Sequence, residues 1–364
     1  MGTAPAEGSS CAVICEYNPF HHGHLWQLND LKRRFETIIC IRGGNLTQRG
    51  IPAIADRFHR ADAALSCGAN LVVELPFPWC CASAGDFARG GISIAKRLNA
   101  GVLAFSAETD EKTLCEAAER ISGSLPEETS EDHARIPYPK LMEERSGLCL
   151  KGRPNDILAL EYLRHAGSLP SFILRRNPAY ASSTDIRASG RPGELIPREA
   201  ARVLSQDPSF PRSAEAVDGF LLSSLRNECP KGCYAVPDEL RAGILRCLTD
   251  VRSVRELASA VSGKMFTVSR VNRALWSSVM RVSPETVQGV PPYALLLAAD
   301  EAGRTFLKSS SPSVPVVSRP AALKDDPVFS LNLRLNRILG TFYGGEDDLS
   351  RRPFFKTSAV SPEE

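Results

Sequence analysis

Long apolar runs are missing from this sequence. No stretch approaches the roughly 20 apolar residues that a membrane helix needs, so we expect no membrane span. The opening MGTAPAEGSS lacks the basic and apolar regions of a signal peptide, from which we expect a cytoplasmic protein. An excess of one charge is missing too, because 44 Lys and Arg against 42 Asp and Glu leave a net charge of +2. That balance favours no particular class of partner.

Paired cysteine motifs are also absent. The eleven cysteines are scattered, and neither Cys80–Cys81 nor Cys229 with Cys233 has a second Cys or His pair to complete a tetrahedral zinc site. We interpret them as small buried hydrophobic residues and expect no metal site.

The first half of the chain alternates short apolar runs with helical patterns. Strands are predicted at residues 11–15, 37–41, 70–75, 101–105 and 171–176, with helices at about 24–34, 56–69, 84–98, 111–121 and 154–167. Continuous apolar strands between helices are typical of a parallel sheet that is covered on both faces. We therefore predict an α/β, Rossmann-like domain over residues 1–194.

The pattern changes near residue 195. Residues 195–364 carry mainly helical periodicity, which predicts a second, mainly helical C-terminal domain with a small β element. The strand candidates are residues 293–300, 304–308 and 314–318, and a helix is expected at about 330–339.

One stretch of this second half is basic. Eight bases against two acids lie between Arg241 and Arg281, so the stretch could face a polyanion. Arg270 and Arg273 are three residues apart and should share a helical face beside Trp276. A merely solvated basic face is an equally good interpretation, and Trp276 is expected in the core.

The segment EYNPFHHGHLWQL, residues 16–28, holds three of the six histidines. It follows the first predicted strand and enters a helix, and ligands bind at that edge of an open α/β sheet. The helix start offers unpaired backbone N–H groups to phosphate, and Gly23 lets the backbone approach closely. Zinc ligands and helix caps are the rival interpretations of His21 and His24. We favour imidazole donors on phosphate oxygens.

Two motifs carry a resemblance to a known superfamily. His21, His22, Gly23 and His24 resemble the H-x-G-H signature of nucleotidylyltransferases, and SSTDIR at 182–187 resembles their S-S-T-x-I-R segment. The sequence around and beyond these motifs is similar to that of the bacterial tRNA(Met) cytidine acetate ligase family. That likeness rests on EYNPFHHGHL (16–25), GGNLTQRGIPAIADRFHRADAAL (43–65), NLVVELPFPWCCASAGDFARGGISI (70–94), PNDILALEYL (154–163) and RRNPAYASSTDIR (175–187). It continues more weakly through FTVSRVNRAL (266–275), YALLLAADEAGRTFLK (293–308) and PVVSRP (315–320).

The resemblance implies a nucleotidylyltransferase fold and a ligase. Such an enzyme adenylates acetate with ATP and passes the acetyl group to N4 of the wobble cytidine in the anticodon loop of elongator tRNA(Met), giving N4-acetylcytidine. It implies His21 and His24 as catalytic residues and leaves open whether Mg2+ accompanies the ATP. The implied ATP-binding residues are Val13, Ile14, Cys15, Glu16, Tyr17, Asn18, Pro19, Phe20, His21, His22, Gly23, His24, Leu25, Trp26, Gln27, Ser106, Asn155, Arg175, Arg176, Ser183 and Thr184.

Three positions depart from the family's usual pattern. His22 stands where Asn is common, Ser106 where glycine is typical, and Ala181 where a His often follows the Tyr. The added atoms of Ser106 could lower the affinity for ATP.

The loop after the second strand supplies further polar groups. Asn45, Gln48, Arg49 and Asp56 are candidates for contacting acetate or the cytidine edge, although Asp56 could simply cap the next helix. In the helical domain, Arg270 and Arg273 are the candidate tRNA contacts.

Two other functions are consistent with the same motifs. One is a small-molecule adenylyltransferase, for which a basic helical extension has no evident use. The other is a non-catalytic RNA-binding protein with an ATP-shaped pocket.

Overall fold

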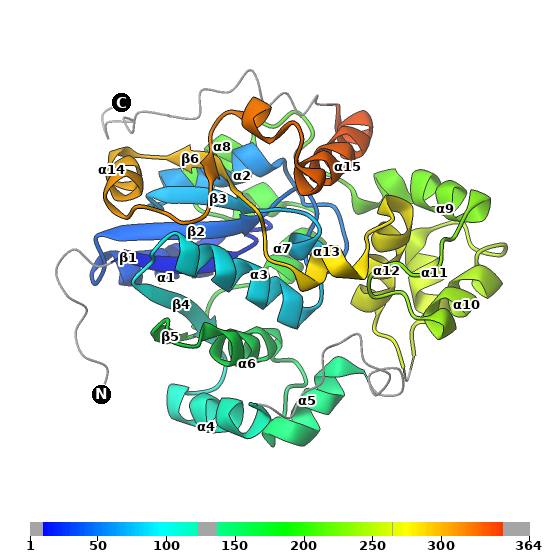
Figure 1. Cartoon of the computed structure of the whole chain (residues 1–364), viewed down its shortest axis with the longest axis horizontal. Coiled ribbons are helices and arrows are strands. Elements are labelled where there is room, and N and C mark those ends of the chain that lie inside the picture. The colour runs from blue at the N-terminus through cyan, green and yellow to red at the C-terminus, as the bar shows by residue number, and fades with distance from the viewer. Residues whose placement is uncertain (1–9, 123–136, 264, 345–364) are drawn as a thin grey trace.

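A computed structural model describes residues 10–122, 137–263 and 265–344 of the chain. Its centre is a seven-stranded sheet in the order β5-β4-β1-β2-β3-β6-β7, with helices on both faces (Figure 1). The strands are β1 (Ser10–Cys15), β2 (Thr37–Gly43), β3 (Leu71–Leu75), β4 (Val102–Ala107), β5 (Ser171–Arg175), β6 (Ala294–Ala299) and β7 (Val316–Val317).

The first five strands run parallel, which confirms the predicted α/β sheet. Their apolar runs are buried on both faces, as in β2, where Ile38 through Ile41 have no exposed surface. In parallel strands all carboxyl ends meet at one edge, so the loops after β1, β2 and β4 lie together.

Helices follow the strands as the apolar periodicity predicts. Within the described first half they are α1 (His22–Lys32), α2 (Arg57–Ser66), α3 (Ala84–Arg97), α4 (Glu111–Ile121), α5 (Tyr138–Ser146), α6 (Pro154–Ala166), α7 (Ser183–Ala188) and α8 (Arg198–Leu204). The first of these begins two residues earlier than predicted, because His21 is its N-cap.

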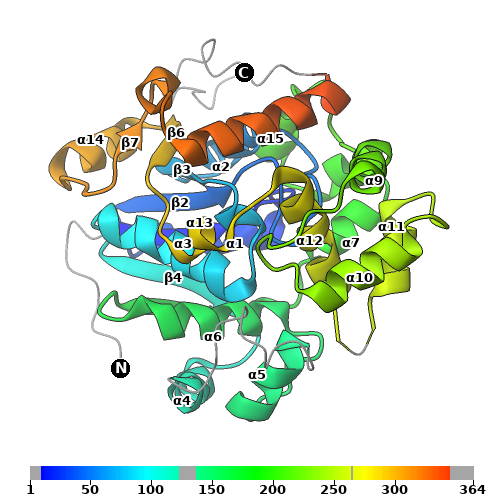
Figure 2. The same cartoon turned by 45° about the vertical axis from the view of Figure 1, so that its right-hand side comes forward.

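The second half contains a helical unit with a small core of its own. It consists of α9 (Asp218–Asn227), α10 (Asp238–Cys247), α11 (Val254–Val261) and α12 (Val268–Met280), which lie together at one side of the sheet (Figure 2). Leu222, Leu240, Leu257 and Leu275 meet in that core. Trp276, at 1% exposure, is a core residue as predicted.

The small β element is where the structure corrects the sequence. β6 pairs antiparallel with β3, and β7 pairs with β6, so both extend the first sheet instead of forming a separate unit. The strand predicted at 304–308 is wrong, since those residues lie in α14 (Glu301–Ser309), which Asp300 caps through the Gly303 N–H. A short apolar run cannot by itself distinguish a strand from a helix.

Two more helices complete the fold. α13 (Pro284–Gln288) precedes β6, and α15 (Pro327–Tyr343) extends the helix predicted at 330–339 in both directions. Among the described helices, none is both long and apolar enough to cross a membrane.

Candidate active site

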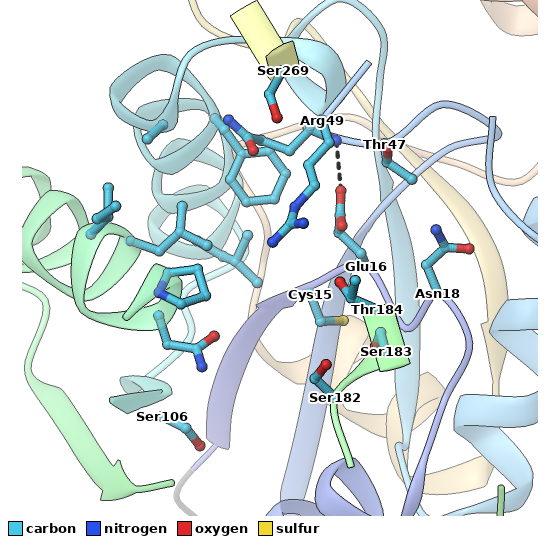
Figure 3. A pocket seen from close by; sticks show the side chains of 18 of the residues that line it. Cys15, Glu16, Asn18, Thr47, Arg49, Ser106, Ser182, Ser183, Thr184 and Ser269 are labelled. Atoms are coloured by element: carbon cyan, nitrogen blue, oxygen red, sulfur yellow. Dashed lines mark hydrogen bonds between the residues drawn. The ribbon is translucent and has the colours of Figure 1, made fainter. Parts of the chain in front are cut away.

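A cavity of about 480 Å3 opens at the carboxyl ends of the central strands. Its walls come from the loops after β1 and β2, the end of β4, and helices α1, α6, α7 and α12. The cavity therefore lies between the sheet and the helical unit. Figure 3 shows its polar side chains, with Ser106 on one side and Arg49 and Ser269 on another.

The two motif histidines cap α1 with one ring nitrogen each. His21 Nδ1 accepts the Gly23 N–H at 3.1 Å, and His24 Nδ1 accepts the His21 N–H at 3.2 Å. A neutral imidazole whose Nδ1 accepts a hydrogen bond carries its proton on Nε2. Both rings also line the cavity, so the cap interpretation is confirmed and the donor interpretation stays a prediction.

The environment keeps these imidazoles neutral. Burial lowers the pKa of His21 to about 4, and the charges of Arg176 and His22 add to the effect. Burial also holds the pKa of His24 well below its ordinary value, with further contributions from His21 and Arg176. The two rings stack with their centroids 3.6 Å apart, where two positive charges would repel. At neutral pH the site thus offers two N–H donors rather than two cations.

The loop around these histidines is held by buried polar contacts. Asn18 Oδ1 accepts the Ile54 N–H at 2.7 Å. Arg60, 1% exposed, donates to the backbone oxygens of Glu16, Gly44 and Ala55, which ties the loops after β1 and β2 together. Removal of that guanidinium would leave three buried carbonyls without their donor.

The second motif lies against the first. Ser182 and Asp185 form a capping box at the start of α7, and Ser183 and Thr184 in its first turn line the cavity. Arg187 donates to the Asn18 carbonyl, which joins the two motifs directly. Arg187 lies within the quoted SSTDIR segment, yet sequence reasoning did not assign it to the site.

On the β4 side, three predicted residues reach the cavity and one does not. Ser106, Asn155 and Arg176 line it, whereas Arg175 is exposed at the end of β5 and does not. Adjacent residues on a strand point to opposite faces, so only one of the arginine pair can face the site.

Glu108 orients that wall, although sequence reasoning did not assign it to the site. Its carboxylate accepts from Asn155 Nδ2 at 2.7 Å and lies 3.5 Å from Arg176 Nη1. Burial raises the pKa of Glu108.

The loop after β2 is only partly as expected. Gln48 and Arg49 line the cavity, but Asn45 and Asp56 do not. Asn45 instead accepts the Arg57 N–H and donates to Asn336. Asp56 caps α2 through the Phe58 and His59 N–H groups, which was the alternative interpretation of that residue.

The two arginines that we predicted as tRNA contacts are buried. Arg270 and Arg273 are 6% and 7% exposed, and both line the cavity. Arg273 Nη1 donates to the Gln48 carbonyl at 3.3 Å, and the Arg270 guanidinium lies over the Phe266 ring. Their shared helical face was correctly inferred, but that face closes the cavity instead of facing water.

Four residues of the first motif segment lie outside the cavity wall. Pro19, Phe20, His22 and Leu25 are not among the residues that line the cavity. Phe20 is buried against the rings of Tyr17 and His24, and His22 is exposed.

Comparisons with known proteins show which family this chain resembles. Residues 9–348 match the family model described as HIGH Nucleotidyl Transferase. A tRNA(Met) cytidine acetate ligase of Streptococcus uberis is 32% identical over 86% of this chain and 90% of its own. One of Syntrophotalea carbinolica is 30% identical over 81% of this chain and 80% of its own. The crystal structure of Thermotoga maritima TmcAL bound with alpha-thio ATP superposes with a TM-score of 0.85 at 25% identity, covering 96% of this chain and 100% of that one.

Proposed function

The chain belongs to the HIGH nucleotidyl transferase family and, within it, to the tRNA(Met) cytidine acetate ligase family. From this premise we propose that it is an ATP-dependent ligase that acetylates N4 of the wobble cytidine of elongator tRNA(Met). The observation that carries the proposal is the pair of neutral imidazoles, each with Nδ1 engaged by the backbone, in a cavity that SSTDIR also lines.

In the first step, an acetate oxygen attacks the α-phosphorus of ATP and pyrophosphate leaves. Negative charge builds on the phosphate oxygens, and the Nε2–H groups of His21 and His24 would stabilise it as preorganised donors. Arg176 beside them, together with Ser183 and Thr184 of the cavity wall, would hold the polyphosphate chain. The protein's contribution is position and charge stabilisation, because ATP itself provides the pyrophosphate leaving group.

We place the nucleoside of ATP on the β4 side of the cavity. Ser106 and Asn155 lie there, and an Asn side chain has the donor and acceptor that an adenine edge requires. The ATP would arrive with Mg2+ held by phosphate oxygens and water, as is usual for this ion. Arg49 and Gln48, on the β2 side, remain our candidates for the acetate carboxylate.

We propose that the tRNA docks on the helical unit. Arg246, Arg252 and Arg255 of the basic stretch are exposed, so they can neutralise backbone phosphates. Lys264, also in that stretch, lies outside the described residues. The buried pair Arg270 and Arg273 would act further in, at the cavity wall. The anticodon loop would supply a splayed wobble base, and the reaction belongs in the cytoplasm with its tRNA.

Exchange of labelled pyrophosphate into ATP tests the first step. The proposal predicts exchange that requires acetate and needs no tRNA. Exchange without acetate would indicate an adenylyltransferase with another acceptor. No exchange under any condition would indicate an RNA-binding protein with an ATP-shaped pocket.

A further inference from the structure

The cavity contains one acidic side chain among many basic ones. Of the described residues that line it, Glu16 is the only carboxylate. The basic side chains around the same cavity are Arg49, Arg176, Arg187, Arg270, Arg273, His21 and His24. The arginines suit phosphates and carboxylates. A lone carboxylate in such a site is repelled by those ligands, so Glu16 suits a different chemical group.

Glu16 is held in one position. It directly follows β1, and its Oε1 accepts the Gln48 N–H at 2.6 Å (Figure 3). Its backbone oxygen accepts from Arg60 Nη1 at 2.8 Å. Both the main chain and the side chain are therefore fixed, while the half-buried residue still lines the cavity.

The sheet order shows on which side of the cavity Glu16 lies. β1 lies between β4 and β2, so the end of β1 separates Ser106 on the β4 side from Gln48 and Arg49 on the β2 side. Through Gln48, Glu16 is tied to the β2 side, where Arg273 of α12 also bonds the Gln48 carbonyl. With the nucleoside of ATP on the β4 side, Glu16 faces the part of the cavity that the helical unit walls.

With tRNA docked on the helical unit as proposed, the nucleobase would enter from that side. Cytosine differs from uracil by an exocyclic amine, which is a hydrogen-bond donor that Glu and Asp side chains accept. We propose that Glu16 receives the exocyclic amine of the acceptor cytidine and takes its proton during acetyl transfer. This inference rests on the proposed function and assigns a residue to its second step.

The N4 lone pair attacks the acetyl carbonyl carbon, and a C–N bond forms. The bond between that carbon and the phosphate oxygen breaks, and AMP leaves with the electron pair. One N4 proton passes to the Glu16 carboxylate and from there to water. The bond from Gln48 uses Oε1, and the second carboxylate oxygen would be the acceptor.

Glu16→Gln is the direct test, because a glutamine carbonyl can still accept the Gln48 N–H. Glu199→Gln, an exposed charge change on α8, is the matched control. We expect Glu16→Gln to slow acetate-dependent pyrophosphate exchange far less than it slows acetyl transfer, so the ratio of the two losses is the readout. We expect its single-turnover acetyl transfer to tRNA to slow by roughly 100-fold, as for loss of a general base, with unchanged tRNA affinity. Glu199→Gln should leave both steps unchanged.

Two results would overturn this role. Equal loss of exchange and transfer would assign Glu16 to ATP or to its Mg2+, and a rising Mg2+ requirement for exchange would identify the ion. Unchanged transfer would leave Glu16 as a holder of the Gln48 loop only. Failure of the proposed function is distinguishable, because the wild-type protein itself would then lack acetate-dependent exchange.

Discussion

At the scale of single residues, His21 and His24 each use their two ring nitrogens in different ways. Nδ1 caps the helix and Nε2 is left as a donor at the cavity. This division predicts that exchanging either His for a simple capping residue removes one phosphate donor. His22, between them, has neither task in the structure, since it is exposed and does not line the cavity.

We predict that His24→Ala lowers kcat/KM of acetate-dependent pyrophosphate exchange by roughly 100- to 1,000-fold, the usual loss for one donor to a developing charge. His22→Ala is the matched control and should retain full exchange. Steady-state exchange rates on folded protein check both. Full exchange in His24→Ala would refute the phosphate role.

A second prediction concerns acid stability. Because burial lowers the pKa of His21 to about 4, the unfolded chain takes up its proton first as the pH falls. The stability that depends on neutral His21 is complete above pH 6.5, the ordinary value, and is lost between pH 6.5 and about 4. His21→Asn keeps a capping acceptor but cannot titrate.

Denaturant unfolding at several pH values measures this effect. The free energy of unfolding of His21→Asn should fall less than that of wild type between pH 6.5 and 4.5. Parallel curves for the two proteins would show that His21 does not titrate in that window.

Single residues were predictable where their position depends on the nearby sequence, and not where it depends on a distant partner. The position of His21 and His24 between a strand and a helix was sufficient to predict that both lie at the cavity, and their role as phosphate donors stays a prediction. Asn45 could not be assigned correctly, because its partner Asn336 lies 291 residues away in the sequence. Arg270 and Arg273 share a face by spacing alone, but spacing does not say whether that face meets water or protein.

At the scale of elements, α15 stabilises the sheet through a buried polar network. Asn336 accepts from Asn45 Nδ2 at 2.9 Å, and Asn332 donates to Glu74, whose other oxygen pairs with Arg57 at 2.7 Å. The Arg57 and Glu74 side chains are 1% and 0% exposed. Water cannot reach these buried charges, so a neighbouring amide such as that of Asn332 provides hydrogen bonds in its place.

We predict that Asn336→Leu destabilises the protein by about 1–3 kcal/mol, because it leaves a buried Asn45 donor without its acceptor. Ser330→Ala, an exposed change on the same helix, is the control and should be nearly neutral. Chemical denaturation gives the free energies. If Asn45 is structural, the KM for acetate in the exchange assay stays unchanged, and a large rise would restore Asn45 as a substrate contact.

Elements were predictable where the pattern was long and repeated. The five parallel strands of the first half are confirmed, since buried strands between helices produce a regular alternation. The segment 304–308 was not, because a run of five residues with two apolar ones at its centre fits a strand and a helix equally well. Its Asp300 cap is the local signal that could have identified the helix.

At the scale of the whole molecule, the helical unit closes the site that the sheet builds. The loop after β2 packs closely against α12. A Cβ atom on Gly50, whose φ is +72°, would lie 2.6 Å from the backbone nitrogen of Arg273. No larger residue fits that contact without moving the helix. The division at residue 195 stays a prediction. The sequence could not show that β6 and β7 return to the first sheet, since strand pairing across more than 200 residues leaves no local trace.

Our prediction for the tRNA surface uses exposed arginines. The double variant Arg246→Ala/Arg255→Ala should raise the KM for tRNA and reduce the salt slope of binding by about two, one for each cation removed. Pyrophosphate exchange should be unchanged, because neither residue lines the cavity. Equal tRNA binding by the variant and the wild type at all salt concentrations would place the tRNA elsewhere.

Mass spectrometry of tRNA nucleosides tests the central claim most directly. Purified elongator tRNA(Met) is incubated with the protein, ATP and isotopically labelled acetate, then digested. We predict labelled N4-acetylcytidine at the wobble position, formed only when ATP is present. Unlabelled cytidine in a reaction that still exchanges pyrophosphate in response to acetate would contradict the account, because activated acetate would then have a different acceptor.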